Sequence, residues 1–160
     1  MTTESNEMTF EDLVAEALDE LPEDLAAQMA NDAEGATKLV RIHVDGAHSD
    51  EEARTAARAV ASSQLTKCSW YGEDPYWGRV ASDLGSAGVG FDPMLLAVAY
   101  GDTVVCRHGV EVEHDRDAVR AHMAQRDLHI TAHLGLGSGK ATVLTCDLTH
   151  AYVDENMGTS

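Results

Sequence analysis

The chain is poor in basic residues and in aromatic residues, and it has no long apolar run. Lys and Arg total 11 against 28 Asp and Glu, which gives a formal net charge of −17 with histidine neutral. A surface with this charge repels phosphate backbones and anionic lipids, so we expect neither a nucleic-acid partner nor a membrane. No stretch reaches the roughly 20 apolar residues of a membrane span. Residues 1–7 also lack the basic and apolar regions of a signal peptide, so we expect a cytoplasmic protein.

Cysteine is also scarce. Cys68, Cys106 and Cys146 are odd in number and about 40 residues apart, which argues against a disulfide framework and a thiolate zinc site. We expect all three to be small buried apolar side chains. His129 and His133 stand four residues apart, and in a strand this spacing separates them by about 13 Å, too far to share a metal. We predict a solvent-facing role for both and no metal site.

The composition is otherwise that of one ordinary folded domain. Apolar residues make up 44% of the 160 residues and charged residues 24%, close to the globular average. We assign residues 1–8 to a polar leader and residues 9–160 to a single domain. Three or so predicted helices alternate with five or six predicted strands, which indicates an α/β or α+β layered domain.

Apolar periodicity predicts the individual elements. Helices are expected over 10–29, where Pro22 either kinks one helix or opens a second, over 49–61 after a capping box at Ser49, and over 115–125. One or two helical turns are expected over 80–84, and a last helical turn is expected from Thr149. Strands are expected over 39–44, 65–70, within 95–112, over 128–134 and over 141–148. We interpret the glycine-rich stretch 135–139 as a hairpin turn between the last two strands. It is not a phosphate loop, because Lys140 is followed by Ala141 where that motif has Ser or Thr.

The loop over 72–79 concentrates chemically active groups. It holds two carboxylates, a proline turn, two aromatic side chains and Arg79 within eight residues. Arg79 can pair with Glu73 or Asp74 to hold the loop, or it can bind a substrate carboxylate through a bidentate contact. The sequence leaves both roles open.

Several motifs occur in a fixed order along nearly the whole chain from Phe10. They are Asp32-Ala-Glu-Gly-Ala-Thr-Lys38, Ser49-Asp-Glu-Glu-Ala53, Ser63-Gln-Leu-Thr-Lys67, Gly72-Glu-Asp-Pro-Tyr-Trp-Gly-Arg79 and Cys146-Asp-Leu-Thr149, followed by Tyr152-Val153 and Glu155-Asn156. In this order they resemble the C-terminal part of the ornithine acetyltransferase family, the bifunctional glutamate N-acetyltransferases of arginine biosynthesis. Tyr76 stands where that family usually has Asn.

The resemblance implies a layered α/β sandwich with a mixed sheet and acyl transfer by an N-terminal nucleophile. Family members cleave themselves before a threonine, which takes the acetyl group from N-acetylornithine and passes it to glutamate. Acetyl-CoA is a second acetyl donor that the family implies, and no bound cofactor is expected. The resemblance also implies amino-acid substrates and assembly as a dimer of heterodimers.

Carried over residue by residue, the family's substrate-binding positions fall on Glu34, Asn156 and Ser160. A carboxylate at Glu34 suits the amino group of ornithine or glutamate, and Asn156 offers both a donor and an acceptor. The family's cleavage threonine has no counterpart here, and Thr142 matches a late strand instead, so we expect no catalytic residue in this chain. We expect it to pair with a chain that carries the N-terminal part of the enzyme and to form an oligomer. The alternative is a non-catalytic amino-acid-binding or assembly subunit.

Overall fold

The described part of the chain is built on one mixed sheet. The computed structural model describes residues 33 and 35–157. Its six strands lie in the order β4-β3-β2-β5-β1-β6. In chain order the elements are β1 (Leu39–Ala47), α3 (Asp50–Ser62), α4 (Gln64–Tyr71), α5 (Trp77–Ser86), β2 (Ala97–Tyr100), β3 (Thr103–Arg107), β4 (Val110–Glu111), α6 (Arg116–Met123), β5 (Asp127–His133), β6 (Gly139–Cys146) and α7 (His150–Asn156).

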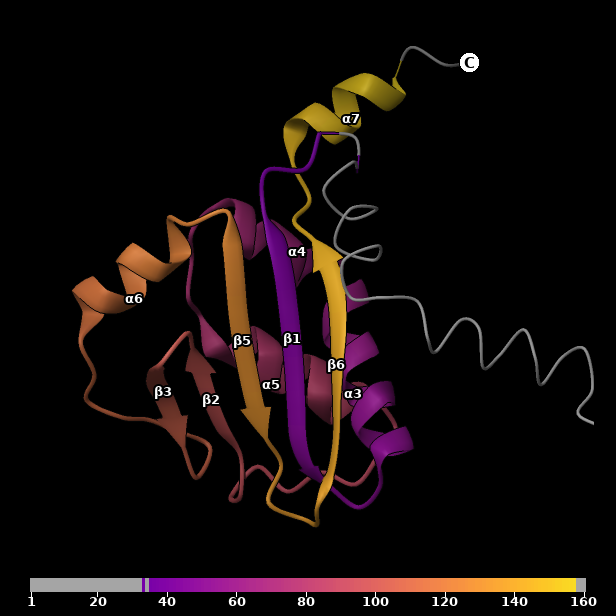
Figure 1. The fold of residues 1–160 in the computed structure, drawn as a ribbon, viewed down its shortest axis with the longest axis vertical. Coiled ribbons are helices and arrows are strands. Elements are labelled where there is room, and N and C mark those ends of the chain that lie inside the picture. Colours follow the sequence, from indigo (N-terminus) through magenta and orange to yellow (C-terminus); the bar gives the residue numbers. More distant parts are fainter. Residues whose placement is uncertain (1–32, 34, 158–160) are drawn as a thin grey trace, which may run out of the picture.

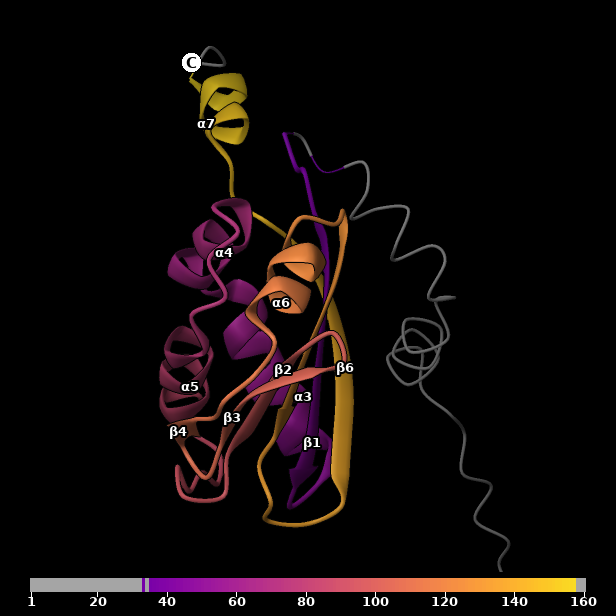
Figure 2. The ribbon, with the colours of Figure 1, turned by 90° about the vertical axis from the view of Figure 1, so that its left-hand side faces the viewer.

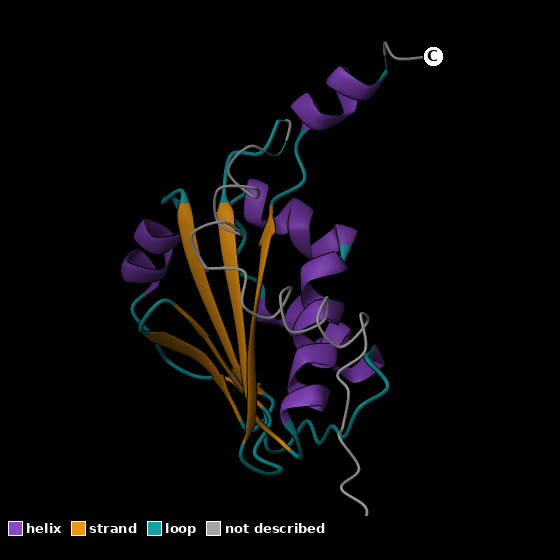
Figure 3. Cartoon of the chain, turned by 45° about the vertical axis from the view of Figure 1, so that its right-hand side comes forward, coloured by secondary structure: helices purple, strands orange, loops and turns teal. Residues whose placement is uncertain are grey.

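Helices α3, α4 and α5 cover one face of the sheet (Figures 1 and 2). The alternation of the strands explains this layering. In β1 the side chains of Val40, Ile42 and Val44 are fully buried, whereas Arg41 and His43 between them are partly exposed. Figure 3 shows these three helices together on one side of the strands. The expected layered α/β fold with a mixed sheet is therefore confirmed.

Alanines let α3 pack closely on the sheet. Ala53, Ala56, Ala57 and Val60 recur at intervals of three and four residues and are fully buried. The helix begins as the capping box predicts, because the Ser49 hydroxyl oxygen accepts the N–H of the residue three positions on at 3.2 Å. This helix packs against β1 and β6, the strands at one edge of the sheet.

The predicted hairpin between the last two strands is wrong. β5 runs parallel to β1, and β6 runs antiparallel to β1 on its other side. The glycine-rich turn therefore connects β5 to β6 across the end of β1, which lies between them in the sheet. A Cβ atom on Gly137 would lie 2.6 Å from the carbonyl oxygen of Ala47, and one on Gly139 would lie 2.2 Å from the carbonyl carbon of Ser49. The glycines are needed for this close crossing.

A second correction concerns residues 65–70, which form helix α4 and not a strand. Thr66, Ser69 and Trp70 are buried at spacings of three and four residues, which is a helical period. The segment mixes residue types that favour helices with others that favour strands, so its intrinsic preference is weak and the packing of the Trp70 ring decides for the helix. Helix α5 is also longer than the predicted segment 80–84.

The prediction that all three cysteines are buried is wrong for two of them, and the predicted exposure of His129 and His133 is confirmed. Cys106 is buried as expected, whereas Cys68 is exposed and Cys146 is half-buried. His129 and His133 are exposed on the face of the sheet opposite helices α3, α4 and α5. The predicted helix over 10–29 lies outside the described residues. Within the described ranges, no helix combines the length and apolar character needed to cross a bilayer.

Candidate functional site

Two of the motifs meet where β1 begins and β6 ends. The β1–β6 register pairs Leu39 with Cys146, so the residues before Leu39 lie beside those after Cys146. Figure 1 shows this end of the sheet, with α7 extending beyond it. The motifs at 32–38 and 146–149 are therefore neighbours in space although more than 100 residues separate them in the chain.

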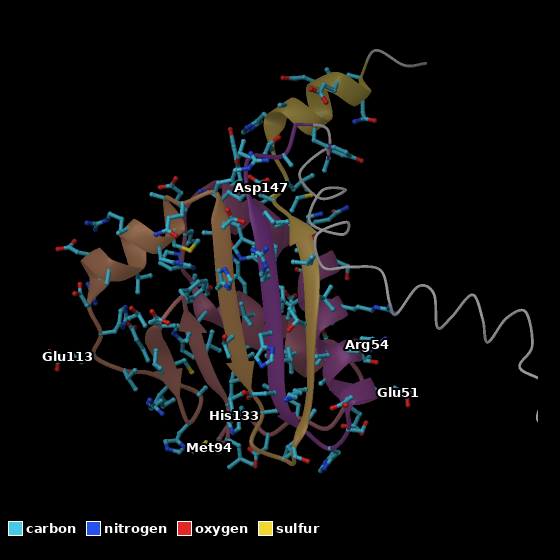
Figure 4. All side chains as sticks on the ribbon, in the orientation of Figure 1. Glu51, Arg54, Met94, Glu113, His133 and Asp147 are labelled. Carbon is cyan, nitrogen blue, oxygen red and sulfur yellow. The ribbon has the colours of Figure 1, made fainter. Side chains whose placement is uncertain are left out.

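A buried carboxylate fastens the segment before β1. Oδ1 of Asp147 accepts the backbone N–H of Thr37 at 2.9 Å and that of Lys38 at 3.1 Å. Its Oδ2 accepts the Thr37 hydroxyl. Asp147 is only 4% exposed, so these three donors replace the water that the carboxylate would otherwise bind. Figure 4 places Asp147 near the start of β1, on the side of α7.

Thr149 makes a second connection to the same segment. Its hydroxyl donates to the carbonyl oxygen of Gly35 at 2.6 Å, and the same oxygen accepts the N–H of Tyr152 at 3.2 Å. The second bond caps the N-terminus of α7. One buried hydroxyl therefore joins the chain next to Glu34 to the first turn of α7.

Gly35 lies directly against α7. Its φ angle is +68°, a region that side-chain-bearing residues rarely adopt. A Cβ atom built on it would lie 2.5 Å from the backbone nitrogen of Tyr152 and 2.9 Å from the carbonyl carbon of Ala151. Only glycine fits this contact, which brings the backbone beside Glu34 onto the helix.

The three expected substrate-binding residues differ in what the structure says of them. Glu34 and Ser160 lie outside the described residues. Asn156 lies in the last turn of α7, is exposed, and donates from Nδ2 to the carbonyl oxygen of Tyr152 at 2.7 Å. Four residues of helix separate it from the Gly35 contact, a rise of about 6 Å. The same short helix thus adjoins the Glu34 motif at one end and carries Asn156 at the other.

Lys38 connects this site to two other parts of the chain. Its side chain is 7% exposed, and Nζ donates to the carbonyl oxygens of Met123 at 2.7 Å and Gln125 at 3.2 Å, where α6 ends. Nζ also lies 3.4 Å from Oε1 of Glu73. A cation at a helix C-terminus is electrostatically favourable, and here it also holds the loop over 72–79.

The loop over 72–79 is held by its own ion pair. Arg79 lies 3.2 Å from the Asp74 carboxylate, which confirms the structural pairing that the sequence allowed. Glu73 has a φ angle of 55°, so the loop turns through a left-handed residue that is not glycine. Beneath the loop, burial raises the pKa of Tyr100, the Asp74 carboxylate raises it further, and the Arg79 guanidinium opposes both. Tyr100 therefore stays neutral as part of the core.

The loop also borders a depression of about 520 Å³. Val105 and Val119 contribute apolar surface to it, and Glu111 and Arg116 contribute charges. Glu73 lines this depression and contacts Lys38, so the depression adjoins the segment that carries the Glu34 motif.

Thr142 is not part of this site. Its hydroxyl forms a hydrogen bond of 2.9 Å with Nδ1 of His43 on the face of the sheet opposite α3. Five residues of β6 and the following turn separate it from Asp147, about 17 Å along an extended chain. Among the residues that the structure describes, no three His, Cys, Asp or Glu side chains are grouped so that they could hold a metal ion.

The comparison with known proteins agrees with the motifs that meet here. The ArgJ family model matches residues 2–158. The chain belongs to the ArgJ family. Its curated relatives include the arginine biosynthesis bifunctional protein ArgJ of Ruegeria pomeroyi, 45% identical over 143 residues, and that of Mycobacterium bovis, 41% identical over 145 residues. These alignments cover 89% and 91% of this chain.

A solved ArgJ structure has the same fold. The crystal structure of arginine biosynthesis bifunctional protein ArgJ from Bacillus halodurans matches with a TM-score of 0.83 and 32% sequence identity, over 99% of this chain and 73% of that one. In contrast, the chain spans only 35% of the length of the two curated ArgJ relatives. It therefore corresponds to about a third of an ArgJ protein.

Three residues of this site were not singled out from the sequence. Asp147, Thr149 and Lys38 belong to motifs that carried the resemblance, but the sequence assigned none of them a contact in this site, and Thr149 was expected only to begin the last helical segment. A weak signal was present for Asp147, because a carboxylate inside the predicted strand 141–148 needs hydrogen-bond donors if it is buried. The contacts of Lys38 join three separate elements, and no local pattern predicts them.

Proposed function

We propose that this chain is the substrate-binding part of an arginine-biosynthesis acetyltransferase that moves an acetyl group from N-acetylornithine to glutamate. Membership of the ArgJ family carries the proposal, and the convergence of two family motifs at one end of the sheet supports it. Glu34 binds the amino group of the substrate, and Asn156 and Ser160 contact the rest of its head group. Acetyl-CoA serves as a second acetyl donor.

The bond-making group comes from another segment. A threonine nucleophile outside this chain attacks the acetyl carbonyl of N-acetylornithine and releases ornithine, and the amino group of glutamate then takes the acetyl group from the threonine. This chain contributes orientation, because holding an amine against the reacting carbonyl removes much of the entropic barrier. The carboxylate of Glu34 supplies a charge-assisted hydrogen bond for that purpose.

The covered lengths support a two-part enzyme. The chain covers 35% of the Ruegeria ArgJ protein and 73% of the solved Bacillus chain, so the solved chain has about half the length of the curated protein. A functional ArgJ unit divided into two polypeptides accounts for that difference. We propose that this chain assembles with the missing part and that the resulting unit oligomerises.

The test is reconstitution. The chain is purified alone and together with the N-terminal part of an ArgJ enzyme, and acetyl transfer from N-acetylornithine to glutamate is measured. We expect activity only in the mixture. Glu34→Ala should raise KM roughly 10- to 100-fold, since a charged hydrogen bond is lost, whereas Glu113→Ala, which removes an exposed carboxylate elsewhere, should leave KM unchanged (Figure 4).

Other outcomes separate the alternatives. Calorimetric binding of ornithine or glutamate by a mixture that transfers no acetyl group would indicate an amino-acid-binding subunit. Association with the N-terminal part, without ligand binding and without transfer, would indicate an assembly role. Either result contradicts the proposed function.

A further inference from the structure

The depression between the loop over 72–79 and helix α6 has carboxylates on one side and guanidinium groups on the other. Its volume of about 520 Å³ is typical of a site for a small molecule. Glu73 and Asp74 line it from the loop, and Arg116 and Arg120 line it from α6. A ligand that matches both sides carries a negative and a positive charge.

The two loop carboxylates are held in place and keep capacity for a ligand. Nζ of Lys38 lies 3.4 Å from Oε1 of Glu73, and Nη2 of Arg79 lies 3.2 Å from Oδ2 of Asp74. Each ion pair uses one carboxylate oxygen, and the Glu73 and Asp74 side chains remain 46% and 47% exposed. The second oxygen of each carboxylate can therefore accept from a cationic group.

An exposed aromatic ring lines the same depression. Tyr76 is 59% exposed, and a Cβ atom on Gly78 would lie only 2.7 Å from Cζ of its ring. The ring therefore rests on the backbone of Gly78. Tyr76 precedes α5 but its side chain forms no capping hydrogen bond with that helix. A ring that is packed on one side and exposed elsewhere can stack against a cation.

The side formed by α6 and β4 matches the head group of an amino acid. Nη2 of Arg116 lies 3.9 Å from Oε1 of Glu111, and both side chains are mostly exposed. Such a long, solvated ion pair is weak, so Arg116 can bind a carboxylate while Glu111 binds the ammonium group next to it. Arg120 is engaged by Asp117 at 2.9 Å, which leaves Arg116 as the anchor for the carboxylate.

We propose that this depression binds an amino acid whose side chain carries a second positive charge. The α-carboxylate binds Arg116, the α-ammonium group binds Glu111, and the side-chain cation lies between Tyr76 and the loop carboxylates. The net charge of −17 on the chain attracts such a ligand. None of the residues assigned in the proposed function takes part, so the inference does not depend on that function.

Calorimetry of the chain with L-arginine as the probe tests the proposal. We expect L-arginine to bind, and agmatine, which lacks the carboxylate, and L-citrulline, which lacks the side-chain charge, to bind about ten-fold more weakly. Arg116→Gln should weaken L-arginine binding about ten-fold and Tyr76→Leu about three-fold, whereas Tyr76→Phe keeps the ring and the affinity. The matched control is Arg58→Gln, which removes an exposed guanidinium group on α3 that does not line the depression.

Each result decides. Absence of L-arginine binding at millimolar concentration overturns the inference and leaves the proposed function intact. Equal affinities for L-arginine and L-citrulline, or equal affinities of Arg116→Gln and Arg58→Gln for L-arginine, also overturn it. Binding that is lost in Glu34→Ala and kept in Arg116→Gln assigns the ligand to the proposed substrate-binding residues and overturns the inference. The reverse pattern supports it, whatever the reconstitution of acetyl transfer shows.

Discussion

Replacing Gly35 by alanine tests whether α7 is held against the segment before β1. The new Cβ would lie 2.5 Å from the nitrogen of Tyr152 and 2.9 Å from the carbonyl carbon of Ala151. Both neighbours are backbone atoms, so neither can rotate away, and relief requires movement of α7 by about 1 Å or more. The substitution therefore separates the Glu34 motif from the helix that carries Asn156.

The expected cost has two parts. A left-handed backbone angle disfavours alanine by roughly 1–2 kcal/mol. The forced contact adds about 1–3 kcal/mol, as overpacking commonly does. Gly88 provides the control, because its φ angle is +76° and a Cβ there would meet nothing within 4 Å. Gly88→Ala should therefore lower the free energy of unfolding only by the cost of the left-handed backbone angle.

Urea unfolding gives the free energy of unfolding for both variants, and hydrogen exchange reports on the α7 amides. We expect Gly35→Ala to lose about 1–3 kcal/mol more than Gly88→Ala and to lose protection over 150–157, with the core strands still protected. Equal destabilisation of the two variants, with unchanged α7 exchange, would refute the contact and the reasoning built on it.

Three further predictions concern single side chains. Lys38→Met should lower the free energy of unfolding by about 2–3 kcal/mol, because two carbonyls at the end of α6 lose their buried donor, and an equally large loss in the exposed control Lys140→Met would contradict this. Burial lowers the pKa of His122, whose Nε2 accepts a β5 N–H at 3.1 Å. The folded state then binds the proton less tightly, so His122 contributes stability that is complete above about pH 6.5 and falls below it. Urea midpoints should show a smaller fall in His122→Gln, and identical pH profiles would exclude the effect. Burial also raises the pKa of the Cys106 thiol, so a thiol reagent should modify Cys68 in the folded protein and Cys106 only after unfolding.

Local patterns predicted the elements that their own side chains determine. The alternation of Val40, Ile42 and Val44 predicted β1, and Ser49 predicted the start of α3, because burial and capping act over a few residues. Helix α4 was missed because its residues have little preference for either a helix or a strand. The burial of Trp70 against the rest of the core determines its conformation. That burial depends on distant elements, which no short window contains.

The site was predictable only in part for the same reason. The resemblance pointed to Glu34 and Asn156, because a family motif indicates which residues have a function but not which residues they contact. The roles of Asp147, Thr149 and Lys38 follow from contacts between residues far apart in the chain. Placing β6 beside β5, as the glycine turn suggested, would have left the motif at 146–149 without its partner.

The register of the sheet is what finally places Asp147. Ile42 pairs with Val143 and Val44 with Ala141, so Ala141 and Val143 pack against the core on the helix side of the sheet when Cys146 lies beside Leu39. A slip of one residue would turn every side chain of β6 to the opposite face. The partly buried side chain of Val143 would lose its packing against the core, and the carboxylate that follows the strand would no longer meet the N–H groups before β1. The core that selects this register therefore also determines where the Glu34 motif meets α7.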